Sequence, residues 1–252
     1  MGSGASGGDI WEQKNWQGGC GTLSGSEQRG VRVRALVIGA SGGIGAALAA
    51  RLKGQGAEVV GLSRSQHGLD VTDEPSVVAA LGALTGPFDR VIVATGALEI
   101  GAHRPEKALR SVEPVQLAAQ FALNAVGPLL VLKHALRLLP KDRAAAFAAL
   151  SARVGSIGDN ALGGWYSYRA AKAALNQLVH TAAIEVSRSH PQAVVALLHP
   201  GTVATRFTEK YVGTHPTVTP DQAAMSLLAV LDGLKPADTG GFFDAKGERI
   251  PW

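Results

Sequence analysis

Two residues in the stretch WYSYRAAK, residues 165–172, have the types and the spacing for acid–base chemistry. Tyr168 and Lys172 are four positions apart, so on a helix they lie on the same face. An ammonium group beside a phenol stabilises the phenolate and lowers the pKa of the tyrosine from its usual value of about 10. We therefore expect Tyr168 to exchange a proton with a carbonyl or alcohol oxygen. Tyr166 is six positions from Lys172 and points away from it.

A tyrosine four positions before a lysine also occurs on solvated helix faces, so the pair needs support from the rest of the chain. The stretch GASGGIG, residues 39–45, lies between an apolar run and a helical pattern. There Gly39 can make a tight turn, Gly43 lets the backbone approach a pyrophosphate, and Gly45 lets the helix pack closely on a sheet. The free N–H groups at the start of the helix favour phosphate. A dinucleotide is expected here rather than a plain turn.

The choice of dinucleotide depends on the residues after the second strand. Ser63 and Arg64 follow that strand, and no Asp or Glu occupies positions 61–66. An NAD site would use a carboxylate here to bind the ribose hydroxyls, whereas a 2′-phosphate requires a cation and a hydroxyl. The sequence therefore predicts NADP(H) in preference to NAD(H).

The elements that must position these residues alternate along the chain. The expected strands are apolar throughout and lie at about 33–39, 58–63, 89–96, 143–151 and 193–201. The expected helices lie at about 43–56, 73–84, 112–139, 164–189 and 220–234. Apolar strands that alternate with helices are typical of a parallel sheet covered on both faces. We predict an α/β fold with a single doubly wound Rossmann-type domain at residues 31–252, preceded by a flexible Gly-rich tail or leader at residues 1–30.

The composition excludes several classes of protein. The single cysteine, Cys20, rules out a disulfide framework and a cysteine-based metal site. Neither a secretory signal nor an uninterrupted apolar run of about 18–20 residues is recognisable, so we expect a cytoplasmic protein without a membrane partner. The net charge is +4, but the basic residues are scattered and not interleaved with aromatic ones. Nucleic acid is therefore not an expected partner.

The glycine turn, the Tyr168–Lys172 pair and the segment HPGTVATRF after the next strand together resemble the short-chain dehydrogenase/reductase family. The resemblance covers residues 33–252. WYSYRAAKAALN and the closing GGFFDAKGERIPW are most similar to the bacterial C-factor branch and the sniffer-type carbonyl reductases.

The resemblance implies further roles. Tyr168 would be the acid/base, Lys172 would also bind the nicotinamide ribose, and Asn124 would anchor a water of the proton relay. Besides Tyr168 and Lys172, the positions implied to bind the cofactor are Gly39, Ser41, Gly43, Ile44, Gly45, Ser63, Arg64, Asp70, Val71, Ala94, Thr95, Gly96, Pro200, Gly201, Val203 and Thr205. No metal site is implied.

Two departures from the family pattern stand out. VATG, residues 93–96, replaces the family's Asn-Asn-Ala-Gly, and the family's active-site serine falls on Ala152. Ser151 is adjacent to it, but neighbouring strand residues point to opposite faces. Ser156 is the other hydroxyl available, and we expect it to matter more. Loss of an oxyanion donor would cost about 2–4 kcal/mol of transition-state stabilisation.

The leading hypothesis is an NADP(H)-dependent oxidoreductase that transfers hydride between the nicotinamide and a carbonyl or alcohol substrate. The alternative, kept open by Ala152, is a nucleotide-binding regulatory or signalling protein with little turnover. A sugar-nucleotide epimerase would need a substrate domain for which the chain has no room. Residues 206–219 are expected to cover the substrate pocket, without indicating one ligand. Apolar residues on more than one face of the 113–138 and 164–189 helices predict a homodimer or homotetramer.

Overall fold

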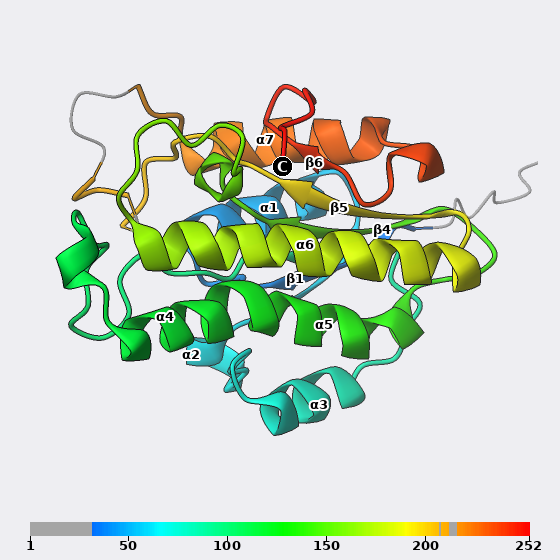
Figure 1. The fold of residues 1–252 in the computed structure, drawn as a ribbon. Coiled ribbons are helices and arrows are strands. Elements are labelled where there is room, and N and C mark those ends of the chain that lie inside the picture. Colours follow the sequence, from blue (N-terminus) through cyan, green and yellow to red (C-terminus); the bar gives the residue numbers. More distant parts are fainter. Residues whose placement is uncertain (1–31, 207, 212–215) are drawn as a thin grey trace, which may run out of the picture. The chain divides into compact units, whose positions relative to one another are not determined.

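The computed structural model describes residues 32–206, 208–211 and 216–252. The predicted tail, residues 1–30, lies outside the described residues. From Arg32 onward the chain forms one compact unit, in which helices cover both faces of a sheet (Figure 1).

The sheet has six parallel strands in the order β2-β1-β3-β4-β5-β6. The strands are β1 Arg34–Ile38, β2 Glu58–Leu62, β3 Arg90–Val93, β4 Ala145–Leu150, β5 Ala193–Leu198 and β6 Phe242–Phe243. Every residue of β4 and β5 is buried, as expected for strands covered on both faces. The predicted fold class is therefore confirmed. The short β6 was not predicted from the sequence.

The predicted helices occur in the predicted order, and the short α2 was not predicted. The helices are α1 Gly43–Gly54, α2 Arg64–His67, α3 Glu74–Gly82, α4 Pro114–Phe121, α5 Gly127–Ala135, α6 Tyr166–Ser189 and α7 Pro220–Gly233. A π-helical turn, η2 Ala122–Val126, joins α4 to α5, and the short 3₁₀ turns are η1 Leu109–Ser111, η3 Leu136–Leu138, η4 Arg153–Gly155 and η5 Pro236–Asp238. Helix α6 begins two residues later than predicted, because Trp165 is left-handed (φ 52°, ψ 41°) and cannot continue a right-handed helix.

Helices lie on both faces of the sheet (Figure 1), and an apolar layer packs between the helices and each face. Alternate strand residues pack against α3, α5 and α6: Leu36, Ile38, Val91, Val93, Phe147, Ala149, Val195 and Leu197. The residues between them pack against α1 and α7: Ala35, Val37, Ile92, Ala146, Ala148, Leu150, Val194, Ala196 and Leu198. This alternation fixes which side chains at the strand ends turn toward α6.

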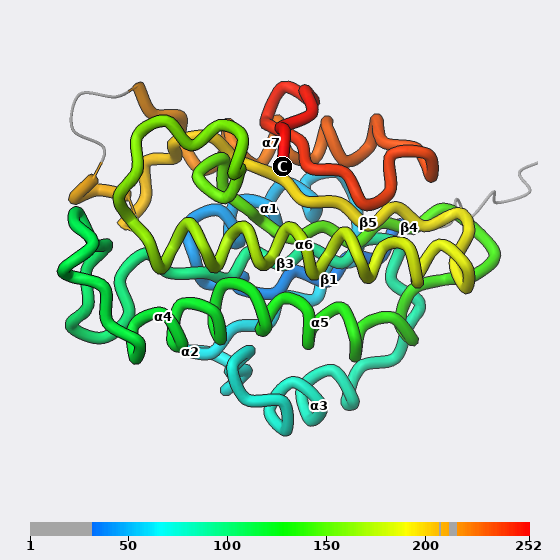
Figure 2. The backbone as a smooth tube through the Cα atoms, in the orientation of Figure 1, coloured from blue at the N-terminus to red at the C-terminus, as the bar shows by residue number. Residues whose placement is uncertain are grey.

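The path of the chain brings the predicted site segments to one edge of the sheet. The strand order reverses between β1 and β3, and ligands of open α/β sheets bind beyond the carboxyl ends of strands at such a point. The tube in Figure 2 shows α4 and α5 lying end to end and α6 running alongside both of them. The continuous helical run Pro114–Leu138 is long and apolar enough to cross a membrane, a property it shares with core helices of soluble proteins.

Candidate active site

Tyr168 and Lys172 lie in the first two turns of α6, on its buried side. Their exposed fractions are 6% and 3%. The Lys172 Nζ atom lies 5.8 Å from the centroid of the Tyr168 ring and donates a hydrogen bond of 2.9 Å to the carbonyl of Leu150, the last residue of β4. The helix therefore holds both side chains against the carboxyl end of the central strands.

Asn124 joins this group from the π-helical turn. The Asn124 amide donates to the carbonyl of Ala97 at 2.9 Å and accepts from the N–H of Ala97 at 3.2 Å. Gly96 has a φ of 153°, and a Cβ atom there would lie 2.8 Å from Asn124 Oδ1 and 3.7 Å from Lys172 Nζ. Because π turns insert an extra residue into a helix, often at functional sites, this turn allows Asn124 to reach the loop after β3.

Burial acts against the charged forms of both ionisable groups. It raises the pKa of Tyr168 above its ordinary value and lowers the pKa of Lys172 to about 7. The prediction that Lys172 lowers the pKa of Tyr168 is therefore wrong for this structure. The ammonium is desolvated together with the phenol, so it is itself only partly protonated at neutral pH. Tyr168 keeps its proton there and is in the form that donates to an oxygen.

The segment around Ala152 supplies no hydroxyl at the position of the family's serine. Ser151 continues the ladder of β4, with its N–H bonded to the carbonyl of Leu198, and its hydroxyl donates to Asn176 Oδ1 on α6 at 2.6 Å. The hydroxyl oxygen of Ser156 accepts from the N–H of Asp159 at 3.1 Å. No described residue accepts the proton of the Ser156 hydroxyl, which leaves that hydroxyl able to donate.

Ser156 is also held close to the lysine. The preceding residue, Gly155, packs so tightly on α6 that a Cβ atom there would lie 2.7 Å from the Cβ of Lys172. The buried Ser156 hydroxyl is thus one residue away from a direct backbone contact with the Tyr168–Lys172 helix.

The glycine turn has the geometry that a dinucleotide requires. Gly39 has a φ of 87°, and a Cβ atom there would lie 3.0 Å from the backbone of Ala94. A Cβ atom on Gly45 would lie 2.2 Å from the carbonyl oxygen of Gly39, so only glycine permits this packing. Helix α1 begins at Gly43 with no side-chain cap and no acidic residue in its first turn. The N–H groups of Ala40 and Gly42 donate to the carbonyls of Leu62 and Gly39, whereas those of Ser41, Gly43 and Ile44 are available to phosphate.

The loop after β3 carries an unpaired polar atom between the glycine turn and the tyrosine. Thr95 follows Ala94, which touches Gly39, and precedes Gly96, which touches Asn124. Its hydroxyl is buried and has no hydrogen-bond partner among the described residues. Because a buried hydroxyl without a partner is costly, this position fits a ligand that passes from the turn to the tyrosine.

The segment after β5 approaches the same turn from the other side. Thr205 lies against Gly43, where a Cβ atom would be 2.8 Å from the Thr205 methyl group. Gly201 has a φ of 76° next to Pro200, and the buried Val203 forms a bridge with Val218. Of the four positions that the resemblance implied in this segment, Thr205 therefore contacts the glycine turn, and Pro200, Gly201 and Val203 precede it on the same loop.

The residues expected around a 2′-phosphate are arranged differently from the prediction. Ser63 is buried, and its hydroxyl accepts from the N–H of Gln66 as the cap of α2, so it is engaged within the protein. Ser65, which the sequence analysis did not single out, donates to the Ser41 hydroxyl at 3.2 Å. Arg64 is exposed beside them. The hydroxyls at the glycine turn are therefore those of Ser41 and Ser65.

Asp70 and Val71 follow α2 in the chain, and Asp70 lies close enough to Arg64 to be affected by its charge. Hydrogen bonds from Thr72, and then the charge of Arg64, lower the pKa of the Asp70 carboxyl. Val71 is buried, and a Cβ atom on Gly127 would lie 2.8 Å from its side chain. Val71 therefore packs against the first residue of α5, at the edge of the candidate site.

The sequence analysis also missed the group that fixes the beginning of α6. The buried carboxylate of Glu106 accepts hydrogen bonds from the N–H of Ser167, at 3.2 Å, and from the Ser167 hydroxyl. The Glu106 carbonyl accepts from the N–H of Trp165. The Trp165 ring lies edge-on to that of Tyr168, with the centroids 6.4 Å apart. Nothing local in the sequence indicates this cap, because Glu106 is 61 residues from Ser167.

Comparison with known proteins bears on this arrangement. Residues 39–231 match a family model described as enoyl-(acyl carrier protein) reductase. The chain is 32% identical to 1-hydroxy-2-glutathionyl-2-methyl-3-butene dehydrogenase of Rhodococcus sp. (strain AD45), with 86% of this chain and 98% of that one covered. It is 34% identical to C-signal of Myxococcus xanthus, with 69% and 98% covered, which confirms the predicted likeness to the C-factor branch.

A solved structure agrees with these relatives. The fold matches a putative short-chain dehydrogenase/reductase from Burkholderia multivorans with bound NADP, at a TM-score of 0.75 and 26% identity, over 88% of this chain and all of that one. The match of the family model covers most of the chain and includes the glycine turn, Asn124, Tyr168 and Lys172. The chain belongs to the short-chain dehydrogenase/reductase family.

Proposed function

We propose that the protein is an NADP(H)-dependent oxidoreductase that transfers hydride between nicotinamide and a carbonyl or alcohol carbon, with Tyr168 as the acid/base. One observation carries the proposal. The buried pair of Tyr168 and Lys172 meets Asn124 and Gly96 at the carboxyl end of the sheet, beside a glycine turn built to accept a pyrophosphate.

The chain's own residues would handle the proton while the bound nicotinamide supplies or accepts the hydride. Tyr168 is protonated at neutral pH, since the ordinary pKa of a phenol is about 10 and burial raises it further, so its phenol can donate to the oxygen of a carbonyl as that oxygen becomes an alkoxide. Lys172, with a pKa of about 7, can exchange a proton near neutral pH. The Asn124 amide holds the loop at Ala97 in place.

Substitution of the tyrosine tests the assignment. Tyr168→Phe should abolish carbonyl reduction and leave nucleotide affinity nearly unchanged, because only the hydroxyl is lost. Tyr166→Phe is the matched control: this residue is exposed, and its change should keep turnover within a few-fold. Oxidation of NADPH with a panel of aldehydes and ketones measures both variants. Substantial activity in Tyr168→Phe would contradict the role.

The preference for NADP(H) rests on Arg64 together with the hydroxyls of Ser41 and Ser65. A cation and two hydroxyls suit a 2′-phosphate, and no described carboxylate adjoins β2 at residues 61–66 to bind the ribose hydroxyls instead. The NADP in the Burkholderia structure supports the same choice. Fluorescence titration should give at least about tenfold tighter binding of NADPH than of NADH, as for a charge-assisted contact of about 1.4 kcal/mol. Arg64→Ala should remove most of that difference, and equal affinities in the parent protein would contradict the preference.

A second candidate is a nucleotide-binding signalling protein with little turnover. Ala152 favours it, because it removes a donor to the developing oxyanion, and so does the likeness to C-signal. Nucleotide binding without turnover of any carbonyl compound would support this candidate. If turnover occurs, Ser156→Ala should lower it more than Ser151→Ala, because the Ser151 hydroxyl is already bonded to Asn176.

We further propose a cytoplasmic homodimer or homotetramer that acts on a small molecule, without nucleic acid or membrane as partner. The name of the Rhodococcus relative gives a glutathionyl alcohol as the compound that it dehydrogenates. This supports an alcohol or carbonyl substrate for the present chain.

A further inference from the structure

A cavity of about 250 Å³ lies between the loop after β3 and the loop after β5. Its lining residues are Ala97, Leu98, Glu99, Arg206, Lys210 and Tyr211. We call it the 99–206 pocket. The first wall contains two apolar residues, Ala97 and Leu98, and the second contains two basic ones, Arg206 and Lys210. A ligand that fits both walls has a short apolar part and an anionic end.

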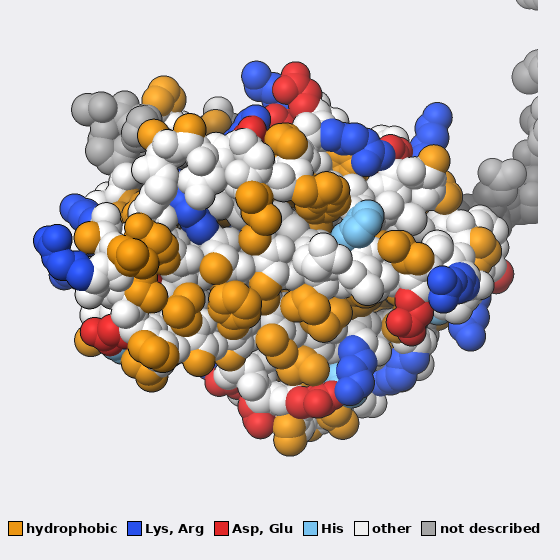
Figure 3. Space-filling view, viewed as in Figure 1, with side chains coloured by type: hydrophobic (Ala, Val, Ile, Leu, Met, Phe, Trp, Pro, Cys, Tyr) orange, Lys and Arg blue, Asp and Glu red, His pale blue; other side chains and the backbone are white. Residues whose placement is uncertain are grey.

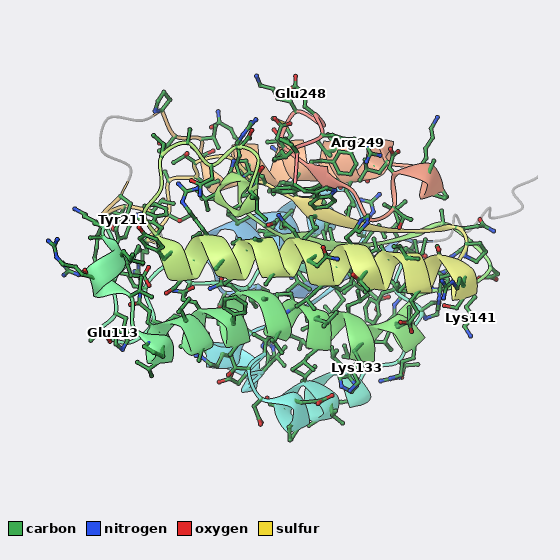
Figure 4. The ribbon with its side chains drawn as sticks, in the orientation of Figure 1. Glu113, Lys133, Lys141, Tyr211, Glu248 and Arg249 are labelled. Carbon is green, nitrogen blue, oxygen red and sulfur yellow. The ribbon has the colours of Figure 1, made fainter. Side chains whose placement is uncertain are left out.

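The 99–206 pocket is next to the tyrosine. The Trp165 ring lies between the two, with its centroid 5.6 Å from that of Tyr211 and 6.4 Å from that of Tyr168. The pocket wall formed by the loop after β3 also contacts the candidate site, because the N–H and the carbonyl of Ala97 are both hydrogen-bonded to the Asn124 side chain. In Figure 4, Tyr211 lies at the end of the domain where α6 begins. A molecule with one end at Tyr168 can therefore have its other end in the pocket.

The charges of the pocket leave one cation uncompensated. Both carboxylate oxygens of Glu99 are engaged, one by Lys210 Nζ at 2.8 Å and the other by the Tyr211 hydroxyl. These two hydrogen bonds lower the pKa of Glu99, which remains an anion that neutralises Lys210. Arg206 makes no hydrogen bond or ion pair with another described residue. Arg206 is exposed and lines the pocket, and Glu99, the one carboxylate among the described lining residues, is already engaged.

A second arginine adds to the positive field at this place. The charge of Arg104 acts on both Glu99 and Tyr211. Lys210 and Arg104 thus both act on Glu99, while Arg206 lines the same pocket. A guanidinium binds a carboxylate in a bidentate manner, which combines charge with direction.

We propose that the 99–206 pocket binds a carboxylate of the substrate through Arg206, so that the substrate class is carbonyl compounds or alcohols with a carboxylate at the end of an apolar spacer. The inference rests on the proposed oxidoreductase function. A single carboxylate is favoured over a phosphate dianion, because Arg206 is the one lining cation that Glu99 leaves unneutralised.

The experiment compares ω-oxo-carboxylates of increasing chain length with their methyl esters, using the full chain and NADPH. At the length that spans Tyr168 and the pocket, kcat/KM should be at least about tenfold higher for the acid than for the ester, mainly through KM. Raising the ionic strength should reduce this ratio, because the contact is partly exposed. Shorter and longer acids should show a smaller ratio.

Two variants decide which residue is responsible. Arg206→Gln should bring the acid-to-ester ratio close to one. Arg188→Gln is the matched control, since this arginine is also exposed but lies near the other end of α6, and it should keep the parent ratio. Equal turnover of acids and esters, or a parent-like ratio in Arg206→Gln, would overturn the proposal. A higher kcat/KM, relative to the methyl ester of the same length, for ω-oxo-phosphates than for the acids would also overturn it, in favour of phosphate.

A binding measurement separates this inference from the proposed function. If neither acids nor esters are turned over, the oxidoreductase assignment fails. Calorimetric titration of the NADP-loaded protein with an ω-hydroxy-carboxylate and with its methyl ester then tests the pocket. Tighter binding of the acid that Arg206→Gln abolishes would support the pocket, whereas equal binding would refute it.

Discussion

The buried position of Lys172 brings its amino group to the candidate site but disfavours the charge of that group. Its Nζ atom reaches Leu150 and approaches Gly96 and Tyr168 only because the side chain lies on the buried face of α6. The same burial disfavours the ammonium and lowers its pKa to about 7 from an ordinary value of 10.5. The residue is therefore costly for stability when charged, and this cost depends on pH.

The sign of that dependence can be tested without substrate. Between pH 7 and 10.5 the unfolded chain binds more protons at Lys172 than the folded chain, so the free energy of unfolding should rise with pH in this window. The rise is at most about 1.4 kcal/mol per pH unit. Urea denaturation of the parent and of Lys172→Met between about pH 7 and pH 9.5 should show this slope in the parent only. The raised pKa of Tyr168 gives a slope of the opposite sign, but only as pH approaches the phenol's ordinary pKa of 10.0, and it is the same in both proteins.

The control is Lys53→Met, which changes an exposed lysine of α1. It should retain the slope of the parent. A slope in Lys172→Met as steep as in the parent would mean that other groups produce the pH dependence.

At the scale of elements, the beginning of α6 decides where the tyrosine lies. Glu106 binds Trp165 through its carbonyl and Ser167 through its carboxylate. Trp165 breaks the helix, so the first turn starts at Tyr166 and places Tyr168 on the buried side. A carboxylate at a helix N-terminus also interacts favourably with the helix dipole. The loop after β3 thus positions Tyr168, the proposed acid/base residue.

Glu106→Gln is the variant that tests this positioning. One of the two donors of Ser167 would then face an amide NH₂ group instead of an acceptor, at a cost of about 1–3 kcal/mol for a buried polar group without a partner. The expected result is a lower urea midpoint and a larger loss in kcat than in NADPH affinity, because Tyr168 follows Ser167 directly. The matched control is Glu113→Gln before α4, where the side chain makes no cap hydrogen bond. Loss of NADPH affinity without loss of kcat in Glu106→Gln would contradict the argument.

The elements themselves were largely predictable from the sequence, while the contacts between distant segments were not. The apolar runs of β4 and β5 and the glycine turn are local patterns, and each lies where the sequence predicts it. Residues that act through long-range contacts gave no local signal: Glu106 caps a helix 61 positions away, and Ser65 reaches Ser41 across the glycine turn. Ser63 was assigned to the cofactor, but its hydroxyl caps α2, a competing use that the composition of the loop does not reveal.

At the scale of the whole domain, one face remains unusually apolar. Figure 3 shows apolar side chains over the outer surfaces of α4, α5 and α6. The exposed apolar residues of these elements include Val115 of α4, Val126 of the π-helical turn and Ile184 of α6, which the sheet does not bury. Exposed apolar surface that extends over several helices is typical of an interface. We propose that a second copy of this chain covers this face, in line with the homodimer or homotetramer inferred from the helix patterns.

A charge placed on that face should separate the copies. Ile184 on α6 is 51% exposed, and Ile184→Lys would put two like charges into an isologous contact. Light scattering coupled to gel filtration should give a dimer or tetramer for the parent and a smaller species for the variant. The control is Met225→Lys: Met225 is 49% exposed but lies on α7, on the opposite face of the sheet, and its change should leave the mass unaltered. A monomeric parent protein would refute the proposal, and an Ile184→Lys variant that keeps the parent mass would exclude the face of α6 as the contact.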